Sequence, residues 1–435
     1  MGGLVADLGP LRRHRAFRLI WTGQLVSGMG GQLTVVAVSY QVYRLTHSTL
    51  DVGLVSLVQL GPLMAGSLAG GSVIDATDRR RVLVVSQVCM ALCSAGLGAN
   101  AFLSRPRLWP LFVCTAASAL FQGTNNPARR AATTMVVPAS DLTGAVALQT
   151  MAVQWAFVVG PALAGVLVSA AGLGTVYLID VGSFCMSLFA TALLPPLPPA
   201  GGGTRAGMRS LADGFRYLRG QKLLASTFLI DLDAMIFGMP RAVFPAMATG
   251  FYHGGPGILG VLYAAPGIGG LVGSLLSGWV GRVRHQGRAV VIAVVGWGAA
   301  VALFGVVRVL WLGVALLAVA GASDLVSAVF RSSILQASVP DHLQGRLAGV
   351  YFAVVAGGPR VGDVEAGIAA RLGGPQFAVW SGGLACIAGV GLLLWRVPEL
   401  WRARSDVEER EAGPSLAAVE AVGQATAELS ESAPP

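Results

Sequence analysis

The sequence predicts an all-α membrane protein with twelve transmembrane helices in two pseudo-symmetric six-helix bundles. Three observations predict this fold: scarce charge, twelve long apolar runs and a segment that occurs twice. Charged types make up only 12% of the 435 residues, against about 25% in soluble proteins. Hydrophobic types make up 54%, which excludes both an ordinary soluble enzyme and a largely disordered chain.

The apolar runs indicate the individual helices. A helix needs about 20 apolar residues to cross a bilayer, and only helices and closed barrels satisfy their backbone there. Twelve runs meet this length within a few residues, and breaks rich in Pro, Gly or charge separate them. They lie at 17–43, 50–74, 81–103, 108–127, 142–170, 174–195, 223–249, 256–281, 288–307, 309–330, 345–371 and 376–396.

The basic residues predict the orientation. If the first segment is cytoplasmic, 23 of the 30 basic residues fall in cytoplasmic segments and five in outer ones. Cytoplasmic loops are enriched in Lys and Arg. We therefore expect a multi-pass protein of the cytoplasmic (inner) cell membrane with both termini inside. The formal net charge of +9 is then an inward-facing basic surface, and no nucleic-acid partner is expected.

Composition divides the chain into four parts. Residues 1–195 form the N-terminal six-helix bundle and residues 223–397 the C-terminal one. Residues 196–222 form a cytoplasmic linker, in which Leu211, Phe215 and Leu218 recur at helical spacing and predict an amphipathic helix at the inner membrane surface. Residues 398–435 hold eight acidic and three basic residues, which predicts a disordered acidic cytoplasmic tail.

Two segments of the chain repeat. PARRAATTMVVPASDLTGAVAL at 127–148 is similar to FRSSILQASVPDHLQGRLAGV at 330–350, and Gly160-Pro161 matches Gly358-Pro359. Two six-helix halves repeated in parallel are typical of the major facilitator superfamily. The chain resembles that superfamily over residues 15–397.

The loop after the second predicted helix, GGSVIDATDRRR at 70–81, resembles the superfamily's loop motif. Ala76 and Asp78 depart from it, because Arg and Gly usually stand there. The resemblance implies a gating role, in which Asp75 caps the eleventh helix or pairs with Arg346 near its start. A solvated basic loop without such a role is the alternative. The motif residues are Gly71, Asp75, Arg79 and Arg80.

A second motif lies on the fifth predicted helix. GPALAG at 160–165, with Gly160, Pro161 and Gly165, resembles the superfamily's antiporter motif, although the full motif has more glycines. Gly and Pro there bend a helix and permit close packing between the halves. An ordinary kink is the alternative.

The linker phrase ADGFRYLRGQKLL and the stretch PAR…VP…DL…GAVAL are most similar to the drug/siderophore exporter branch, which includes enterobactin exporters and macrolide-efflux proteins. This resemblance implies export of a drug, antibiotic or siderophore by alternating access, with protons as the coupling ion. An uncoupled facilitator or importer of a small solute stays open, as does a non-transporting membrane receptor or assembly protein.

Ionisable residues inside spans are costly and usually functional. We expect Asp231 or Asp233 to carry the coupled proton, and the two to lie on different faces. Asp233 and Arg241 are eight residues apart, which places both on one side of a continuous helix. The candidates for proton coupling or for the cavity are Asp231, Asp233, Arg241, Asp324, Arg360, Asp363 and Glu365.

Four of these candidates have specific predictions. Arg360 and Asp363 are spaced to pair on one helical face, and Glu365 is less well placed for Arg360. Asp324 lies on the tenth helix, which lines the cavity in the fold that the chain resembles. Uncharged candidates for substrate contact are Gln32, Asn125, Gln154, Tyr263 and Tyr351, with interhelical hydrogen bonding as the alternative.

No catalytic arrangement stands out. The five His residues are scattered, the five Cys residues lie in apolar runs without metal-type pairing, and no phosphate-binding GxxxxGK[ST] loop occurs. We therefore expect no enzyme activity, no metal and no cofactor. The expected partners are a small-molecule substrate, protons and the lipid bilayer, with the chain as a monomer.

Overall fold

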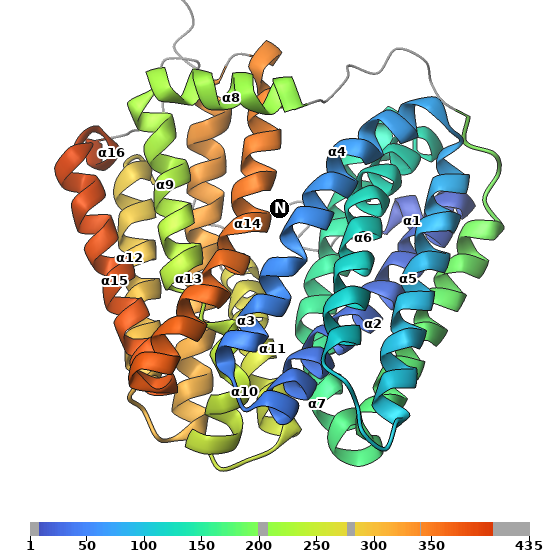
Figure 1. Ribbon diagram of the computed structural model, residues 1–435. Helices are drawn as coiled ribbons and strands as arrows, with labels where there is room; N and C mark the ends of the chain where they lie inside the picture. The colour runs from blue at the N-terminus through green and yellow to red at the C-terminus, as the bar shows by residue number, and fades with distance from the viewer. Residues whose placement is uncertain (1–7, 199–207, 276–282, 340, 403–435) are drawn as a thin grey trace, which may run out of the picture.

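The computed structural model describes residues 8–198, 208–275, 283–339 and 341–402, and within them nearly the whole chain is helical. The helices gather on two sides of the molecule (Figure 1). The N-terminal helix group comprises α1 (Gly9–Arg13), α2 (Arg15–Thr46), α3 (Thr49–Val58), α4 (Leu60–Ala76), α5 (Arg79–Phe102), α6 (Trp109–Val136) and α7 (Ala139–Ala192). The C-terminal helix group comprises α9 (Lys222–Phe237), η1 (Arg241–Val243), α10 (Phe244–Ala246), η2 (Met247–Phe251), α11 (Pro256–Leu275), α12 (Gln286–Phe304), α13 (Leu310–Ser338), α14 (Asp341–Gly373), α15 (Pro375–Arg396) and α16 (Glu399–Arg402).

Helix α3 (Thr49–Val58) connects the two groups. The second apolar run forms one helical stretch, Thr49–Ala76, whose hydrogen bonding is interrupted at Gln59, where α3 ends and α4 begins although the backbone angles of Gln59 stay helical. Helix α3 packs against α14 of the other group. Glycines permit this approach: a Cβ on Gly53 would clash with the backbone of Asp363, and a Cβ on Gly367 would lie 2.8 Å from the Cα of Leu50.

Helix α7 contains the fifth and sixth predicted runs. Helix α7 spans 54 residues, but Gly172 has non-helical backbone angles, φ 81° and ψ 171°. Helix α7 therefore consists of two helical arms that meet at a kink. Gly374, between α14 and α15, has nearly the same backbone angles, φ 89° and ψ 168°. His47 and His253, at equivalent places in the two halves, likewise have similar left-handed backbone angles, with φ of 50° and 49°. These matched connections agree with the sequence repeat.

The seventh run is broken near its middle. Helix α9 ends at Phe237, and after Pro240 the chain continues as η1 (Arg241–Val243), α10 (Phe244–Ala246) and η2 (Met247–Phe251). The indole N–H of Trp297 donates to the carbonyl oxygen of Gly238 at 2.8 Å, which satisfies an acceptor that the break leaves free. The expectation that Asp233 and Arg241 share one continuous helical side is therefore wrong.

Two helices extend further than their apolar runs. Helix α6 continues nine residues past the predicted end at 127, and α13 eight residues past 330. Arg129 and Arg331 were assigned to cytoplasmic loops but lie within these helices. Each Arg has a polar partner on a helix, so its charge does not force the helix to end.

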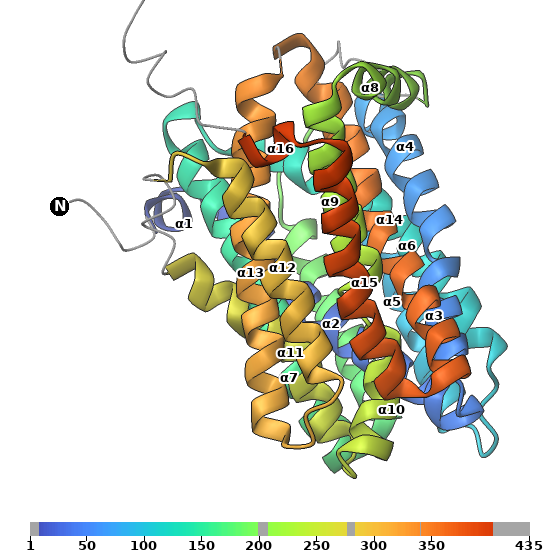
Figure 2. The same cartoon turned by 90° about the vertical axis from the view of Figure 1, so that its left-hand side faces the viewer.

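The predicted linker helix is present as α8 (Met208–Gly220), which lies across one end of the molecule (Figures 1 and 2). Leu218 packs in a cluster with Leu224 and Phe228 of α9 and Val350 of α14. This part of its apolar face therefore contacts protein. We call the two ends of the molecule the α8 end and the α10 end.

The predicted tail begins with structure. Residues 399–402 form α16, where Leu400 is buried and the Trp401 ring lies 5.4 Å from the guanidinium carbon of Arg288. The first residues of the predicted disordered segment are therefore helical. Residues 403–435 lie outside the described part of the chain.

Eight helical stretches in the described residues are long and apolar enough to cross a membrane. The protein is thus a nearly all-helical multi-pass membrane protein. The count of twelve spans stays a prediction. The eight stretches are Thr49–Ala76, Arg79–Phe102, Ala139–Ala192, Lys222–Phe251, Pro256–Leu275, Gln286–Phe304, Leu310–Gln336 and Pro375–Arg396.

Replacing Gly172 by Ala tests the backbone strain at the point where the two arms of α7 meet. The backbone angles of Gly172 are strained for any residue with a Cβ, so we expect Gly172→Ala to lower the free energy of unfolding by about 1–3 kcal/mol. Thermal unfolding of the purified protein in detergent measures it. Gly182→Ala is the control, since Gly182 is helical with open space around it. Equal melting temperatures for the two variants would contradict the strain.

Candidate functional site

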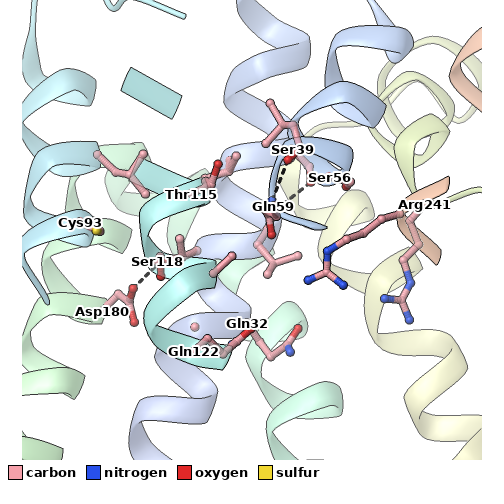
Figure 3. Close-up of a pocket in the computed structure, with 18 of the residues that line it drawn as sticks. Gln32, Ser39, Ser56, Gln59, Cys93, Thr115, Ser118, Gln122, Asp180 and Arg241 are labelled. Carbon is pink, nitrogen blue, oxygen red and sulfur yellow. Dashed lines mark hydrogen bonds between the residues drawn. The ribbon is translucent and has the colours of Figure 1, made fainter. Parts of the chain in front are cut away.

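A cavity of about 360 Å³ lies between the two helix groups. Helices α2, α3, α5, α6 and α7 line one wall, and η1, α11 and α14 line the other. Figure 3 shows polar side chains from both walls around this space. Polar lining residues include Gln32, Ser39, Ser56, Gln59, Ser94, Thr115, Ser118, Gln122, Asp180, Arg241, Tyr263, Arg360 and Asp363.

Asp180 is the one acidic lining residue from the N-terminal helix group, and its side chain is held by hydroxyl groups. Oδ2 accepts hydrogen bonds from Thr34 (2.7 Å) and Ser94 (2.5 Å), and Oδ1 lies 3.2 Å from the Ser183 hydroxyl. The residue is 1% exposed. Among the described residues no basic group forms an ion pair with it, so neutral donors alone solvate this carboxylate.

The opposite wall holds two arginines and one aspartate. Oδ1 of Asp363 accepts from the backbone N–H of Ala242 at 3.0 Å. Arg360 donates from Nη1 to the carbonyl oxygen of Ala356, one turn back on α14, at 2.6 Å. The predicted Arg360–Asp363 ion pair is therefore not formed, because each side chain uses a backbone partner instead.

Two uncharged candidates line the cavity as well. The Tyr263 hydroxyl lies 3.0 Å from the Ser39 hydroxyl of α2 and 3.3 Å from the carbonyl oxygen of Arg241. It therefore connects the two walls. Gln32 lies on the wall of the N-terminal helix group, and Figure 3 places it beside Gln122.

A second polar cluster lies inside the C-terminal helix group. Asp231 of α9 and Arg331 of α13 form an ion pair in which both side chains are almost fully buried. They border a cavity of about 20 Å³, which Tyr351 also lines, and a space of this size holds about one water molecule. Asp324 interacts electrostatically with Arg331 and Asp231. It is absent from the lining of the main cavity, contrary to expectation.

Sequence reasoning missed two of these residues. Arg331 follows the predicted end of the tenth apolar run, because Arg usually ends such a run. The repeat matches it to Arg129, which also lies inside its helix and donates from Nη2 to Asn125 at 3.0 Å. Asp180 lies within the sixth apolar run, and sequence alone does not place three hydroxyl groups around it.

The remaining candidates do not line the main cavity. Asp233 lies against Gly389 and Cys386 of α15, so it faces away from Asp231, as expected. Asn125 is the partner of Arg129. Gln154 lies near Gly270 of α11, and Glu365 is half-buried on α14.

The two sequence motifs lie outside the cavity. Gly165 of α7 meets Gly260 of α11, where a Cβ on Gly260 would lie 2.8 Å from the Cα of Gly165 and 2.5 Å from the carbonyl oxygen of Pro161. Gly160 packs on Met29 and Gln32 of α2 instead. GPALAG is therefore part of a close contact between the helix groups.

The loop motif is attached to the end of α7. Arg79 donates to the carbonyl oxygen of Pro198 at 2.8 Å and Arg80 to that of Ala192 at 2.5 Å. Asp75 is exposed, and Gly71 has open space around it. The side chain of Arg346 lies outside the described part, so the predicted contact of Asp75 with α14 or Arg346 stays a prediction.

Comparison with known proteins identifies the family. Residues 5–422 match the sequence profile of the transmembrane secretion effectors of the major facilitator superfamily. The chain belongs to this family. Relatives include enterobactin exporter EntS of Citrobacter koseri (strain ATCC BAA-895 / CDC 4225-83 / SGSC4696) and EntS of Escherichia coli O139:H28 (strain E24377A / ETEC). Each is 29% identical over 388 residues, which cover 89% of this chain and 92% of the relative.

Solved transporters share the fold of this secretion effector. A POT family transporter in complex with 5-aminolevulinic acid matches with a TM-score of 0.72 at 11% identity, covering 91% of this chain and 99% of that one. A point mutant of the nucleoside transporter NupG matches with a TM-score of 0.69 at 14% identity, covering 89% and 100%. These likenesses show the fold. The family match identifies a membrane transporter of the major facilitator type, whose relatives are named as exporters and whose relatives and structural neighbours are transporters rather than enzymes.

Breaking the buried ion pair tests its role in the fold. Arg331→Met leaves Asp231 buried and unpaired, so we expect the free energy of unfolding to fall by about 3–5 kcal/mol. The double variant Asp231→Leu/Arg331→Met should recover most of this loss in thermal unfolding, because it removes both charges. The control is Arg216→Met in the exposed Asp213–Arg216 pair. A double variant no more stable than Arg331→Met alone would contradict the pairing.

Proposed function

We propose that the protein exports a small organic molecule, such as a drug, antibiotic or siderophore, from the cytoplasm by alternating access. One observation carries the proposal: a polar cavity of about 360 Å³ lies between two helix groups that touch closely at glycines. Transporters of this superfamily bind substrate near the midplane between their halves. The EntS relatives, named as enterobactin exporters, support outward transport.

The topology we propose has twelve spans in two six-helix bundles, residues 1–195 and 223–397, joined by the linker 196–222. Helices α2, α6 and α14 and the two arms of α7 would cross the membrane in addition to the other apolar stretches. The α8 end would face the cytoplasm, as would both termini. The excess of Arg in the segments assigned to that side supports this orientation. The protein would work as a monomer in the inner membrane.

Alternating access requires an interface that opens and closes. The contacts of α3 with α14 and of α7 with α11 connect the helix groups near the α10 end. Glycines make both contacts, so the helices can slide or separate without repacking large side chains. We assign gating at the α10 end to these two helix contacts, which include Gly160, Pro161 and Gly165. At the α8 end we assign gating to the loop motif, with Gly71, Asp75, Arg79 and Arg80, and to Arg346.

Efflux measurements test export. In a host without its major efflux pumps, expression should lower the accumulation of at least one radiolabelled compound from a panel of antibiotics and siderophores. Gly165→Val should abolish this effect, because its side chain would push α7 from α11, whereas Gly182→Val should retain it, because Gly182 has open space. No compound exported by wild type would refute the exporter and favour a receptor or assembly protein. Raised accumulation would indicate an importer.

We infer that protons drive export through Asp231. A buried carboxylate beside a cavity that holds about one water molecule can exchange a proton, and a neutral Asp231 would leave Arg331 without its ion-pair partner. The charged and titratable groups facing this pair are Asp324 and Tyr351, which interact electrostatically with it. An inward-moving proton on Asp231 would release Arg331 and loosen the contact between α9 and α13.

Proteoliposomes with an imposed pH gradient test the coupling. For wild type we expect dissipation of the gradient to abolish uphill transport, since one pH unit supplies about 1.4 kcal/mol per proton, enough for about tenfold accumulation of substrate per proton exchanged. Asp231→Asn should transport downhill only and ignore the gradient. Asp233→Asn, the control on the same helix, should keep the wild-type response. Unchanged gradient dependence in Asp231→Asn would exclude this residue, and wild type that ignores the gradient would indicate an uncoupled facilitator.

A further inference from the structure

The charges in the main cavity are unevenly distributed. Both of its arginines, Arg241 and Arg360, lie on the wall of the C-terminal helix group. We propose that the transported molecule is an organic anion, whose carboxylate or acidic phenolate group binds between these two guanidinium groups. This inference rests on the proposed function as a transporter of small organic molecules and specifies the class of substrate.

The two guanidinium groups have unused hydrogen-bonding capacity. In the described residues, the Arg241 guanidinium forms no ion pair and no hydrogen bond, and Arg241 lines the cavity. Arg360 uses Nη1 for a backbone carbonyl, while its Nε is buried without a partner. Each guanidinium carries five N–H donors, and an unpaired buried charge is costly. An oxyanion would satisfy several donors at once.

The nearby carboxylate does not occupy this role. Asp363 is 7% exposed and bonds to the backbone of Ala242. Arg241 and Arg360 interact with it electrostatically, but neither lies within ion-pair distance in the described chain. Asp363 therefore offsets part of the positive charge and leaves the N–H groups open. Asp180 lies on the other wall, where three hydroxyl groups surround it.

The opposite wall indicates the rest of the molecule. Its polar groups are mainly amides and hydroxyls, such as Gln32, Gln59, Gln122, Ser118 and Thr115. Such groups can donate to and accept from hydroxyl or amide substituents, and the apolar lining between them suits a carbon framework. A cationic amine in the same place would meet two guanidinium groups, and the carboxylates of Asp363 and Asp180 in this cavity already accept hydrogen bonds from other groups. The walls together fit a polar organic acid better than a cationic drug.

Matched probes test this inference on the purified full-length protein in detergent. The probes are 3-hydroxy-2-naphthoate and salicylate, each compared with its neutral carboxamide. We expect wild type to bind the acids and to bind the amides at least about tenfold more weakly, because the amides lose the charge-assisted hydrogen bonds to Arg. Arg241→Gln and Arg360→Gln should each weaken binding of the acids by a similar factor. Arg360→Lys should lose less than Arg360→Gln. Arg371→Gln, an exposed position on α14, should bind as wild type does.

Several outcomes would overturn the inference. These are equal binding of acid and amide, wild-type binding of acids by both Gln variants, and no binding of either acid by wild type at millimolar concentration. Gel filtration and thermal unfolding establish that each variant is folded. Acids bound through the arginines without any efflux would refute the exporter but keep the anion site. Efflux of neutral or cationic compounds alone, unchanged in the Gln variants, would refute the anion site but keep the exporter.

Discussion

The cost of removing a charge from water governs the interior of this protein. Asp231 is paired with Arg331, Asp180 is surrounded by hydroxyl groups, and Asp363 accepts a backbone N–H. Each acid thus has donors that replace part of its hydration. The guanidinium groups of Arg241 and Arg360 are the contrast, because they stay under-satisfied beside a cavity. Other buried polar atoms without a partner occur elsewhere in the described chain, but only these two guanidinium groups lie together beside the large cavity, which indicates a place for an additional partner.

Small residues permit movement around these fixed charges. The two helix groups meet where Gly53 approaches Asp363 and where Gly165 approaches Gly260, so backbone contacts backbone. Such contacts gain van der Waals energy over a short stretch and contain few interlocking side chains. An interface of this kind can separate and form again at a low energetic cost. The Tyr263–Ser39 hydrogen bond, which also joins the groups, has the same reversible character.

Hydropathy predicted the helices but not the cluster inside the C-terminal group. The apolar runs placed most helix ends to within a few residues, since membrane burial requires long apolar stretches, but α6 and α13 extend nine and eight residues further. The same rule misplaced Arg331, because it treats Arg as the end of a span, whereas a buried carboxylate on another helix can keep Arg inside. The breaks at Gln59 and Gly238 also depend on contacts with other helices. Residues far apart in the chain, such as Asp231 and Arg331, meet only through the fold, which one sequence does not specify.

Coupling between a proton and a substrate needs a physical connection between their sites. Asp324 interacts electrostatically with Arg331 and Asp231 at one site and with Arg241 at the other. All four residues belong to the C-terminal helix group, so they move together when the groups rock. In the cycle proposed above, a proton on Asp231 would release Arg331, which could then interact more strongly with Asp324, and Asp324 would attract Arg241 less strongly. The field that would hold an anion at Arg241 would therefore depend on the protonation of a residue that the anion does not touch.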